Sequence, residues 1–491
     1  MTAVLVAIAQ SNRKINQSKI ILTFLIALFS TLAHAQKNDI AYSVTALTHI
    51  NIIDATGTPV QTDMTVIITG NRITSLAKTG KSSIPKTANI INGRGKYLIP
   101  GLWDMHFHAL ESVFKSDYRF SLCIANGVTG VRDMWAQLNE IPQVTLWRNQ
   151  FYQQPGTIPR FGAVGTMIDG IPPVHDGSDT ASTAESARLL VTKIKASGSE
   201  FVKVYNNLSR EAYFAIADEC KKLNFPFAGH LPDVILIKEA ADAGQRSIEH
   251  LAGLYNFFYH DCPPRQVIEA LPNEIAKGSP LVPMMKQAIE LCDEQQAMSI
   301  FRHLAEKNVW QCPTLVVLRA THPFNENALF DDPRLKYISF AERERWQTRT
   351  GEKFKARTQQ ERDKEKIFFQ RAVAVISQMK KAGTQFLAGT DVPNHYLYPG
   401  FSLHDELALF VEAGLSPMEA LQTATVNPAK FLGTTDSLGT IEKGKIADMV
   451  LLDANPLLDI NNTQQIRAVF LNGKYLSKKT LESMLLKYRQ Q

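Results

Sequence analysis

Several classes of protein are excluded by what this sequence has little of. It contains five cysteines among 491 residues, too few for a disulfide-rich scaffold, and their odd number and spacing match no zinc knuckle. No apolar run after residue 35 approaches the length of a transmembrane helix. No long polar tract indicates disorder. The remaining composition, 45% hydrophobic and 20% charged, is typical of a globular protein.

The chain also has little excess of charge of one sign. Its 53 lysines and arginines face 47 acidic residues, and three of the basic residues, Arg13, Lys14 and Lys19, lie close to the N-terminus. Without these three, 50 basic residues face 47 acidic ones, a net charge of about +3. Because this excess is small and dispersed, the sequence predicts no nucleic-acid partner.

The first 35 residues are typical of an export signal. Basic residues precede an apolar run, Ile20 to Leu32, which is too short to span a membrane comfortably. Ala33-His34-Ala35 then fits the small-x-small rule for cleavage. We therefore predict a signal peptide over 1–35 and a periplasmic or secreted protein that has no membrane association after cleavage. An uncleaved membrane anchor is the alternative.

The cysteines fall into two groups by context. Cys123, Cys220 and Cys312 lie in apolar surroundings and are predicted to be buried thiols. Cys262 and Cys292 flank one polar stretch, and an oxidising compartment leaves open whether they pair.

Both ends of the mature chain are rich in β-forming residues. Alternating apolar runs and turn residues occur over 41–98 and again over 433–476. This pattern predicts a small β-sandwich domain built from both chain ends, residues 36–98 plus 433–491.

The middle of the chain alternates short apolar strands with helical stretches. Repeated strand–helix units indicate a parallel sheet, and eight of them indicate a closed barrel. The sequence therefore predicts an α/β fold in which residues 99–432 form a (β/α)8 TIM-like barrel. Its strands are expected at 103–108, 128–134, 161–167, 201–205, 226–230, 247–251, 310–316 and 385–391. The connections 252–308 and 317–384 exceed usual loop lengths. Within the second, Glu342–Lys381 is charged and helix-rich, so we expect a solvated outer helix for most of it, and parts of both connections are candidates to cap the barrel mouth.

The first barrel strand carries a His-x-His pattern. Leu98-Ile-Pro-Gly-Leu-Trp-Asp-Met-His-Phe-His108 has histidines two positions apart. Residues two apart in a strand point the same way, so His106 and His108 share a face, with Asp104 one layer deeper. Neutral imidazole suits zinc and similar divalent metals, whereas the alternative is a pair of solvated histidines.

Four further polar residues fall within or at the ends of later strands, where barrel active sites are built. Lys203 is centred in the apolar strand Phe-Val-Lys-Val-Tyr, which is costly without a partner or a task. His230 and His250 each end a short apolar strand, and Asp391 ends Leu-Ala-Gly-Thr-Asp. Each position taken singly has an alternative. Lys203 could form a salt bridge, His230 and His250 could be packed core residues, and Asp391 could cap a helix or turn.

The order His-x-His, strand-end Lys, His, His, Asp resembles the amidohydrolase superfamily. The phrases Gly-Val-Thr-Gly-Val-Arg-Asp-Met, Ala-Gly-Thr-Asp and Leu-Gly-Thr-Ile-Glu-Lys-Gly-Lys-Ile-Ala-Asp-Met-Val resemble it as well. Phe-Val-Lys-Val-Tyr, Gly-His-Leu-Pro and His404-Asp-Glu-Leu are most similar to the imidazolonepropionase-like and prolidase-like branch. The resemblance covers nearly all of the mature chain.

The resemblance implies a site for two divalent metal ions, with zinc expected. It assigns His106, His108 and Asp391 to the more buried ion. His230 and His250 would hold the second ion, and Lys203 would bridge both as an N6-carboxylated lysine. A single-metal site without the modification is the competing possibility.

The implied reaction is hydrolysis of an amide-type bond through a metal-bridging hydroxide, with Asp391 as general base and then general acid. Tyr205 is either a donor to the developing oxyanion or a packing aromatic. His175 and His395 are candidate substrate contacts. A dipeptide, Xaa-Pro or N-acyl amino acid-like substrate is expected.

Other functions compete with this one. A lactonase or cyclic amide hydrolase would use the same metal site, and a catalytically silent binding protein would keep the scaffold alone. The expected partner is a small-molecule or short peptide substrate, and assembly as a homo-oligomer is compatible with the sequence.

Overall fold

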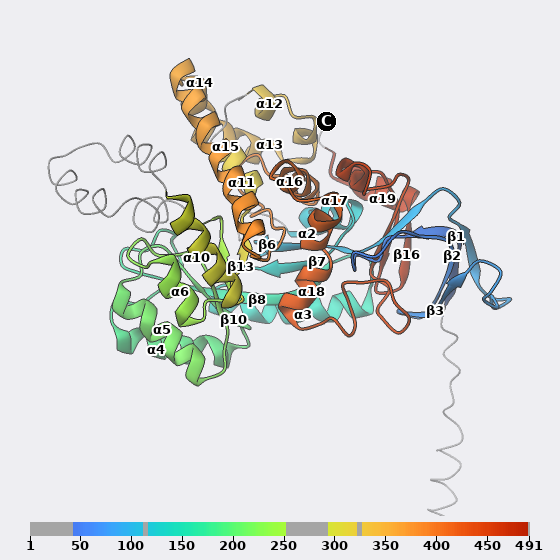
Figure 1. The fold of residues 1–491 in the computed structure, drawn as a ribbon, viewed down its shortest axis with the longest axis horizontal. Helices are drawn as coiled ribbons and strands as arrows, with labels where there is room; N and C mark the ends of the chain where they lie inside the picture. The colour runs from blue at the N-terminus through green and yellow to red at the C-terminus, as the bar shows by residue number, and fades with distance from the viewer. Residues whose placement is uncertain (1–42, 111–115, 252–292, 322–326, 490–491) are drawn as a thin grey trace, which may run out of the picture. The chain divides into compact units, whose positions relative to one another are not determined.

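The computed structural model describes residues 43–110, 116–251, 293–321 and 327–489 (Figure 1). The predicted signal peptide, Cys262 and Cys292 lie outside the described residues, so the structure does not bear on them. Cys123, Cys220 and Cys312 are buried free thiols, as predicted. Within the described residues, no helix has the length and apolar character needed to cross a membrane.

Strands from both chain ends form one mixed sheet of eight strands. The junction is an antiparallel pair in which Pro100 lies opposite Met449. The order is β16-β15-β14-β5-β1-β2-β3, with β4 paired to β1. The strands are β1 Val44–Ile52, β2 Gln61–Thr69, β3 Arg72–Lys78, β4 Asn89–Asn92, β5 Tyr97–Pro100, β14 Met449–Leu452, β15 Ile466–Leu471 and β16 Lys474–Ser477. A β domain built from both ends is therefore present.

The sandwich that the sequence predicts is one continuous, curled sheet. At its β3 edge, the Ile73 amide donates to the Lys445 carbonyl over 2.9 Å, and the Ala447 amide donates to the Asn71 carbonyl over 2.9 Å. These bonds bring β3 back to the segment that precedes β14. The buried side chains of Leu47, Val66 and Phe470 belong to the core that the curled sheet encloses.

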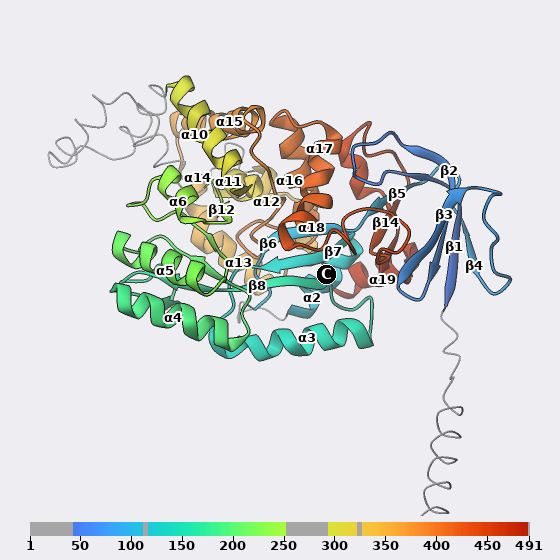
Figure 2. The ribbon, with the colours of Figure 1, turned by 60° about the horizontal axis from the view of Figure 1, so that its bottom comes forward.

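The middle of the chain forms a parallel sheet whose strands follow one another in chain order. Helices connect most neighbouring strands, and Figure 2 shows α3, α4 and α5 on one side of the strands with α16, α17 and α18 on the other. The strands are β6 Leu102–Phe107, β7 Val128–Asp133, β8 Arg160–Asp169, β10 Phe201–Val204, β11 Phe227–Gly229, β12 Ser247–Glu249 and β13 Trp310–Cys312, with β9 Asp179–Thr180 beside β8. Seven of the eight predicted barrel strands are thus present.

The eighth predicted strand, 385–391, is an irregular segment. It nevertheless closes the barrel through isolated bridges, Gln311 with Phe386 on one side and Phe107 with Val392 on the other. The segment leaves the regular strand conformation for two reasons. A Cβ at Gly389 would lie 2.6 Å from the Cys312 sulfur, so the chain passes too close for a side chain. Asp391 then adopts a left-handed backbone with φ of 59°.

Capped helices surround the barrel. Thr183 accepts from the Ser186 amide at the start of α4, and Ser209 accepts from the Ala212 amide at the start of α5. The helices to this point are α2 Ser116–Ala125, α3 Ile141–Gln153, α4 Ala184–Ser197, α5 Arg210–Lys222, α6 Ile237–Ala243 and α10 Glu294–Glu306.

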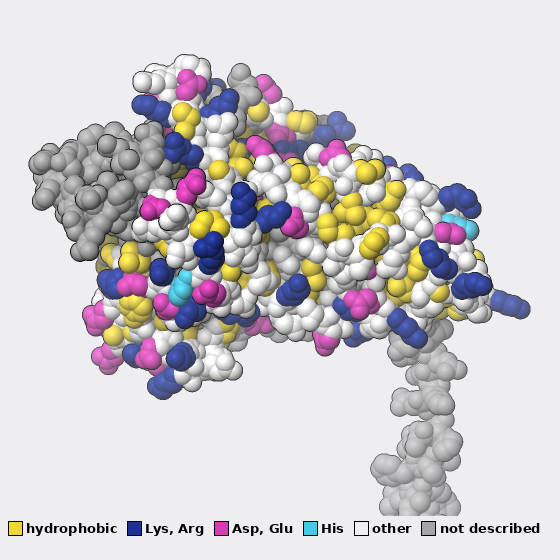
Figure 3. Space-filling model, in the orientation of Figure 1, with side chains coloured by type: hydrophobic (Ala, Val, Ile, Leu, Met, Phe, Trp, Pro, Cys, Tyr) yellow, Lys and Arg dark blue, Asp and Glu magenta, His cyan; other side chains and the backbone are white. Residues whose placement is uncertain are grey.

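The part of the second long connection that the sequence predicts to be helical, Glu342–Lys381, is largely helical. The connection as a whole contains α11 Leu315–Thr321, α12 Asn327–Phe330, α13 Phe340–Trp346, α14 Glu352–Lys355 and α15 Gln359–Lys381. The outer helix α15 buries Phe369 and Ile376 against the barrel while its other face is polar. The chain then continues through α16 Phe401–Glu412, α17 Pro417–Thr423 and α18 Val426–Leu432, and α19 Lys478–Lys487 follows the last strand. On the face drawn in Figure 3, basic and acidic side chains are interspersed.

Candidate metal centre

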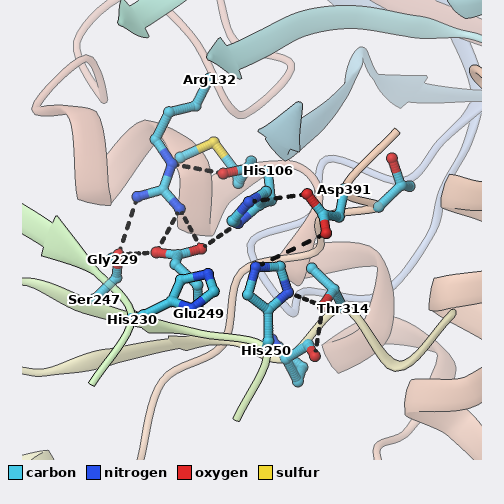
Figure 4. Close-up of polar contacts among 12 residues, drawn as sticks. His106, Arg132, Gly229, His230, Ser247, Glu249, His250, Thr314 and Asp391 are labelled. Carbon is cyan, nitrogen blue, oxygen red and sulfur yellow. Dashed lines mark hydrogen bonds and ion pairs between the residues drawn. The ribbon is translucent and has the colours of Figure 1, made fainter. Parts of the chain in front are cut away.

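Three histidine side chains converge on one carboxylate at the carboxyl ends of the barrel strands. Asp391 Oδ1 lies 3.2 Å from His106 Nε2 and 2.8 Å from His108 Nε2. Its other oxygen, Oδ2, lies 3.9 Å from His250 Nε2. Figure 4 shows Asp391 facing both His106 and His250. The structure therefore brings together residues from β6, from the end of β12 and from the closing segment.

Hydrogen bonds on the far side of the rings fix the tautomers of these histidines. His106 Nδ1 lies 2.8 Å from the Glu249 carboxylate, and His230 Nδ1 lies 2.7 Å from Asn206 Oδ1. A carboxylate and an amide oxygen accept hydrogen bonds, so each Nδ1 carries the proton. The lone pair of each ring is then left on Nε2, which is the arrangement that metal-binding histidines use.

His250 is held in the same way by a hydroxyl group. Its Nδ1 lies 2.6 Å from Thr314 Oγ1, and that hydroxyl donates its own proton to the Pro313 carbonyl. Thr314 can therefore only accept from His250, which again leaves the lone pair on Nε2.

The donor set fits a divalent cation. His106 Nε2 and His230 Nε2 are buried without a hydrogen-bond partner in the described part of the chain, as is His108 Nδ1. His106, His250 and Asp391 each offer a ligand atom within 4.8 Å of the others. Unsatisfied buried nitrogens are costly, and imidazole with carboxylate is a ligand set that zinc accepts.

Burial keeps His108 and His250 neutral, as metal ligation requires, whereas at His106 the carboxylates of Asp391 and Glu249 outweigh burial and raise the pKa. Desolvation, assisted by the charge of Lys203, lowers the pKa of His108 to about 4. Desolvation also lowers the pKa of His250 to about 3. Burial alone would raise the pKa of Asp391, but His250 and His106 outweigh it and hold that pKa well below its usual range. The carboxylate is therefore ionised at neutral pH.

Lys203 is buried in β10 at 2% exposure. The structure gives it no ion pair within the described residues, and desolvation lowers the pKa of its amine. Its Nζ lies 5.3 Å from the centre of the Tyr205 ring. The salt bridge that is the alternative for Lys203 is therefore not observed among the described residues, and the bridging role of this lysine stays a prediction.

The backbone is strained at three of these positions. His250, Thr314 and Asp391 adopt φ of 60°, 46° and 59°, in the left-handed region that residues other than glycine rarely occupy. Such conformations cost about 1–3 kcal/mol each and cluster at functional sites. The strain indicates that the fold holds these side chains in place for a task.

Sequence reasoning missed the ion pair behind His106. Glu249 is fully buried and accepts two hydrogen bonds of 2.9 Å from Arg132 as well as one from Ser247. Arg132 outweighs desolvation and holds the pKa of Glu249 well below its usual range, so the carboxylate is ionised. The available signal was a charged residue inside each of two short apolar strands, β7 and β12.

A cavity of about 410 Å³ opens onto this centre, a size that suits a small ligand. Both proposed substrate contacts, His175 and His395, line it together with Tyr205. His175 Nε2 lies 2.9 Å from the Tyr205 hydroxyl, and the Tyr205 ring packs on His230 with 4.0 Å between ring centres. Tyr205 therefore both packs at the mouth and presents a polar group to the cavity.

The sequence model of the Amidohydrolase family matches residues 97–476. Among curated proteins, an imidazolonepropionase of Fusobacterium nucleatum is 31% identical over 112 residues, which cover 21% of this chain and 25% of that protein. The matched segments make up between 10% and 25% of the lengths of such relatives.

Solved structures resemble the chain over most of its length. A bottromycin amidohydrolase has a TM-score of 0.69 at 20% identity and covers 91% of each chain. A Xaa-Pro dipeptidase with methionine bound in its active site has a TM-score of 0.62 at 18% identity, and the match covers 89% of this chain and all of that one. At this level of identity the likeness shows a shared fold.

Proposed function

Because the chain belongs to the amidohydrolase family, we propose that it is a metal-dependent hydrolase that cleaves an amide-type bond in a small substrate. The observation that carries the proposal is the convergence of His106, His108 and His250 on Asp391 at the carboxyl ends of the barrel strands. Catalytic groups of barrel enzymes are built at this end.

Two divalent ions, with zinc as the first candidate, would be held by this chain's own side chains. His106, His108 and Asp391 would hold one, and His230 with His250 would hold the other. The chemistry that divalent ions supply when bound is polarisation of a carbonyl oxygen and a lowered pKa of water. Lys203 supports a bridging role, because a buried amine with a lowered pKa is a nucleophile for carbon dioxide and becomes an anionic carbamate.

Asp391 is the residue proposed to move the proton. It takes a proton from the attacking water and passes it to the nitrogen of the leaving amine. Its ionised state and its backbone, fixed by a 2.7 Å bond from its amide to the His106 carbonyl, suit it to this role. Tyr205 would donate to the developing oxyanion, and its hydrogen bond with His175 at the cavity supports this role.

The substrate class proposed is a dipeptide, including Xaa-Pro, or an N-acyl amino acid. Support comes from the volume of the cavity and from the printed names of the similar structures, a Xaa-Pro dipeptidase and an amidohydrolase.

The decisive experiment pairs metal content with a substrate panel. The protein without residues 1–35 is purified, its metal is counted, and hydrolysis of dipeptides and N-acyl amino acids is measured beside lactones and cyclic amides. Two metals per chain with hydrolysis of dipeptides or N-acyl amino acids supports the proposal. Turnover of lactones or cyclic amides alone would overturn the proposed substrate class, and metal binding without any turnover would favour a silent binding protein.

Export remains a proposal from the sequence. N-terminal sequencing of the protein recovered from the periplasm or medium of an expressing bacterium would show Gln36 first if the signal is cleaved as predicted. Recovery of the intact N-terminus in the membrane fraction would favour the uncleaved anchor.

A further inference from the structure

Arg345 lines the same cavity as the predicted metal ligands. It lies on α13, within the long connection between β13 and the segment that closes the barrel. Of the described residues that line the cavity, Arg345 is the one permanently charged side chain that is not part of the predicted metal centre. In the proposed hydrolysis, Arg345 has no assigned role.

The helix that carries Arg345 is firmly anchored beside the metal centre. Trp346 is 1% exposed, and its ring centre lies 5.3 Å from that of Tyr396 and 6.0 Å from that of Tyr398, just after Asp391 in the chain. On the other side, the Tyr118 hydroxyl donates to Glu342 over 3.1 Å. Because two independent contacts fix α13, Arg345 is presented to the cavity from a rigid support.

Part of the remaining wall, among the described residues, is apolar. Trp135 and Trp346 contribute aromatic surface, and Met167, Val317 and Pro393 contribute aliphatic surface. A guanidinium group beside apolar walls recognises a ligand that carries both a carboxylate and an apolar group, since its planar fork binds a carboxylate through two hydrogen bonds.

We infer that Arg345 binds the free carboxylate of the substrate's amino acid portion and so determines specificity. The inference rests on the proposed function. It narrows the substrates to amides of α-amino acids that keep a free carboxylate and carry an apolar side chain. In the hydrolysis, water adds to the acyl carbon and the C–N bond breaks. The leaving nitrogen takes a proton from Asp391, and the freed amino acid keeps its carboxylate at Arg345.

The first test compares two substrates that differ only in the carboxylate. Acetate release is measured from N-acetyl-L-phenylalanine and from N-acetyl-L-phenylalaninamide, with wild type, Arg345→Met and Arg345→Lys. In Arg345→Met, KM for the free acid should rise on the order of 10- to 100-fold while KM for the carboxamide stays unchanged. The KM of Arg345→Lys for the free acid should lie between those of wild type and Arg345→Met. Lysine keeps the positive charge but lacks the planar guanidinium group that forms two hydrogen bonds with a carboxylate. Arg343→Met is the matched control, because Arg343 shares the helix and the charge but does not line the cavity.

A second readout separates this inference from the proposed function. Calorimetry on the zinc-loaded protein measures binding of L-phenylalanine and of L-phenylalaninamide. Arg345→Met should weaken binding of L-phenylalanine by a similar factor and leave L-phenylalaninamide unaffected. Equal binding of L-phenylalanine by wild type and a correctly folded Arg345→Met would overturn the inference, even if acetate release continues. Loss of L-phenylalanine binding in that variant, without acetate release by wild type, would uphold Arg345 and overturn the proposed reaction.

Discussion

His250 donates its Nδ1 proton to the hydroxyl of Thr314 over 2.6 Å, across the gap between the sixth barrel strand and the helix that follows the seventh. Thr314 has no other proton to offer, since its own goes to the Pro313 carbonyl. The bond therefore fixes both the tautomer and the orientation of the ring. A hydroxyl that sequence reasoning did not single out thus decides which nitrogen of His250 faces the centre.

Thr314→Val should weaken metal binding while preserving the fold. The valine has the same shape but accepts no hydrogen bond, so the His250 ring loses its orientation. Outer-shell changes of this kind typically cost 10- to 100-fold in metal affinity. Competition with a chromophoric chelator measures the change, and Thr314→Ser, which keeps the hydroxyl, should bind metal almost as well as wild type. Equal affinity in the valine variant would mean that Thr314 has no such role.

Asp391→Asn should abolish turnover and leave most of the metal in place. The amide keeps a ligand oxygen but cannot accept the proton of the attacking water, so kcat should fall by about 10²- to 10⁴-fold. Turnover is scored beside metal content and circular dichroism. Asp436→Asn, at an exposed carboxylate, is the control and should behave as wild type. A near-normal rate in Asp391→Asn would remove the residue from its proposed role.

Lys203→Ala should bind less metal than wild type. The variant removes the only amine placed in the strand to form a carbamate, so fewer than two metal ions per chain should remain. Elemental analysis measures the loss. Lys203→Glu supplies a carboxylate that needs no carbon dioxide and should keep more metal than the alanine variant, whereas exposed Lys381→Ala should keep all of it. Two metals in Lys203→Ala would exclude the carbamate bridge.

Glu249→Gln should affect both stability and metal affinity. It leaves Arg132 buried without its ionised partner, which costs about 3–5 kcal/mol of unfolding free energy. It also loosens the His106 ring. Chemical denaturation measures the first effect. The half-buried Glu200, which pairs with Arg148 at 2.7 Å, offers a matched control, because Glu200→Gln should cost about 1 kcal/mol or less. Similar losses in both variants would argue against a special role for the buried pair.

In the metal-free protein, His108 should contribute a loss of stability as pH falls from about 6.5 to about 4, whereas buried carboxyls with raised pKa, such as Asp133, contribute with the opposite sign. In the unfolded chain His108 takes up a proton near its ordinary pKa of 6.5, whereas burial lowers its pKa to about 4 in the folded protein. At His108 the unfolded state therefore binds more protons in this window, and this contribution makes unfolding easier as pH falls. At about 1.4 kcal/mol per pKa unit, the lowering of the pKa from 6.5 to about 4 gives a contribution from His108 of about 3.5 kcal/mol.

Denaturant titrations of the metal-free protein at several pH values measure this slope. The slope should be smaller in His108→Gln, which has no proton to take up. The same slope in wild type and His108→Gln would contradict the neutral, buried state of the histidine.

Local pattern was enough to single out most of the residues that the structure brings together at the candidate site. The period of two in a strand placed His106 beside His108, and a polar residue at the end of an apolar strand marked His230, His250 and Asp391. These signals work because strand geometry and the arrangement of parallel strands are the same wherever they occur. The family membership inferred from them is confirmed.

What the sequence did not reveal depends on contacts between distant strands. The pairing of Arg132 with Glu249 follows no spacing, because the barrel's closure decides which residues meet. The irregular course of 385–391 arises from the close approach of Gly389 to Cys312, which no local propensity encodes. The place of Arg345 depends on how a long insertion folds back over the barrel mouth.

The closing segment also ties the site to the integrity of the barrel. The Thr390 amide donates to Asp104 over 3.0 Å across 286 positions of chain, and Asp391 meets His106 at the same junction. An ion shared by His106 and Asp391 would act there as a cross-link that closes this very long loop. Because the ion binds the folded barrel and not the unfolded chain, its removal would lower the free energy needed to separate the first barrel strand from the closing segment. The availability of metal would then determine the stability of the folded protein as well as its activity.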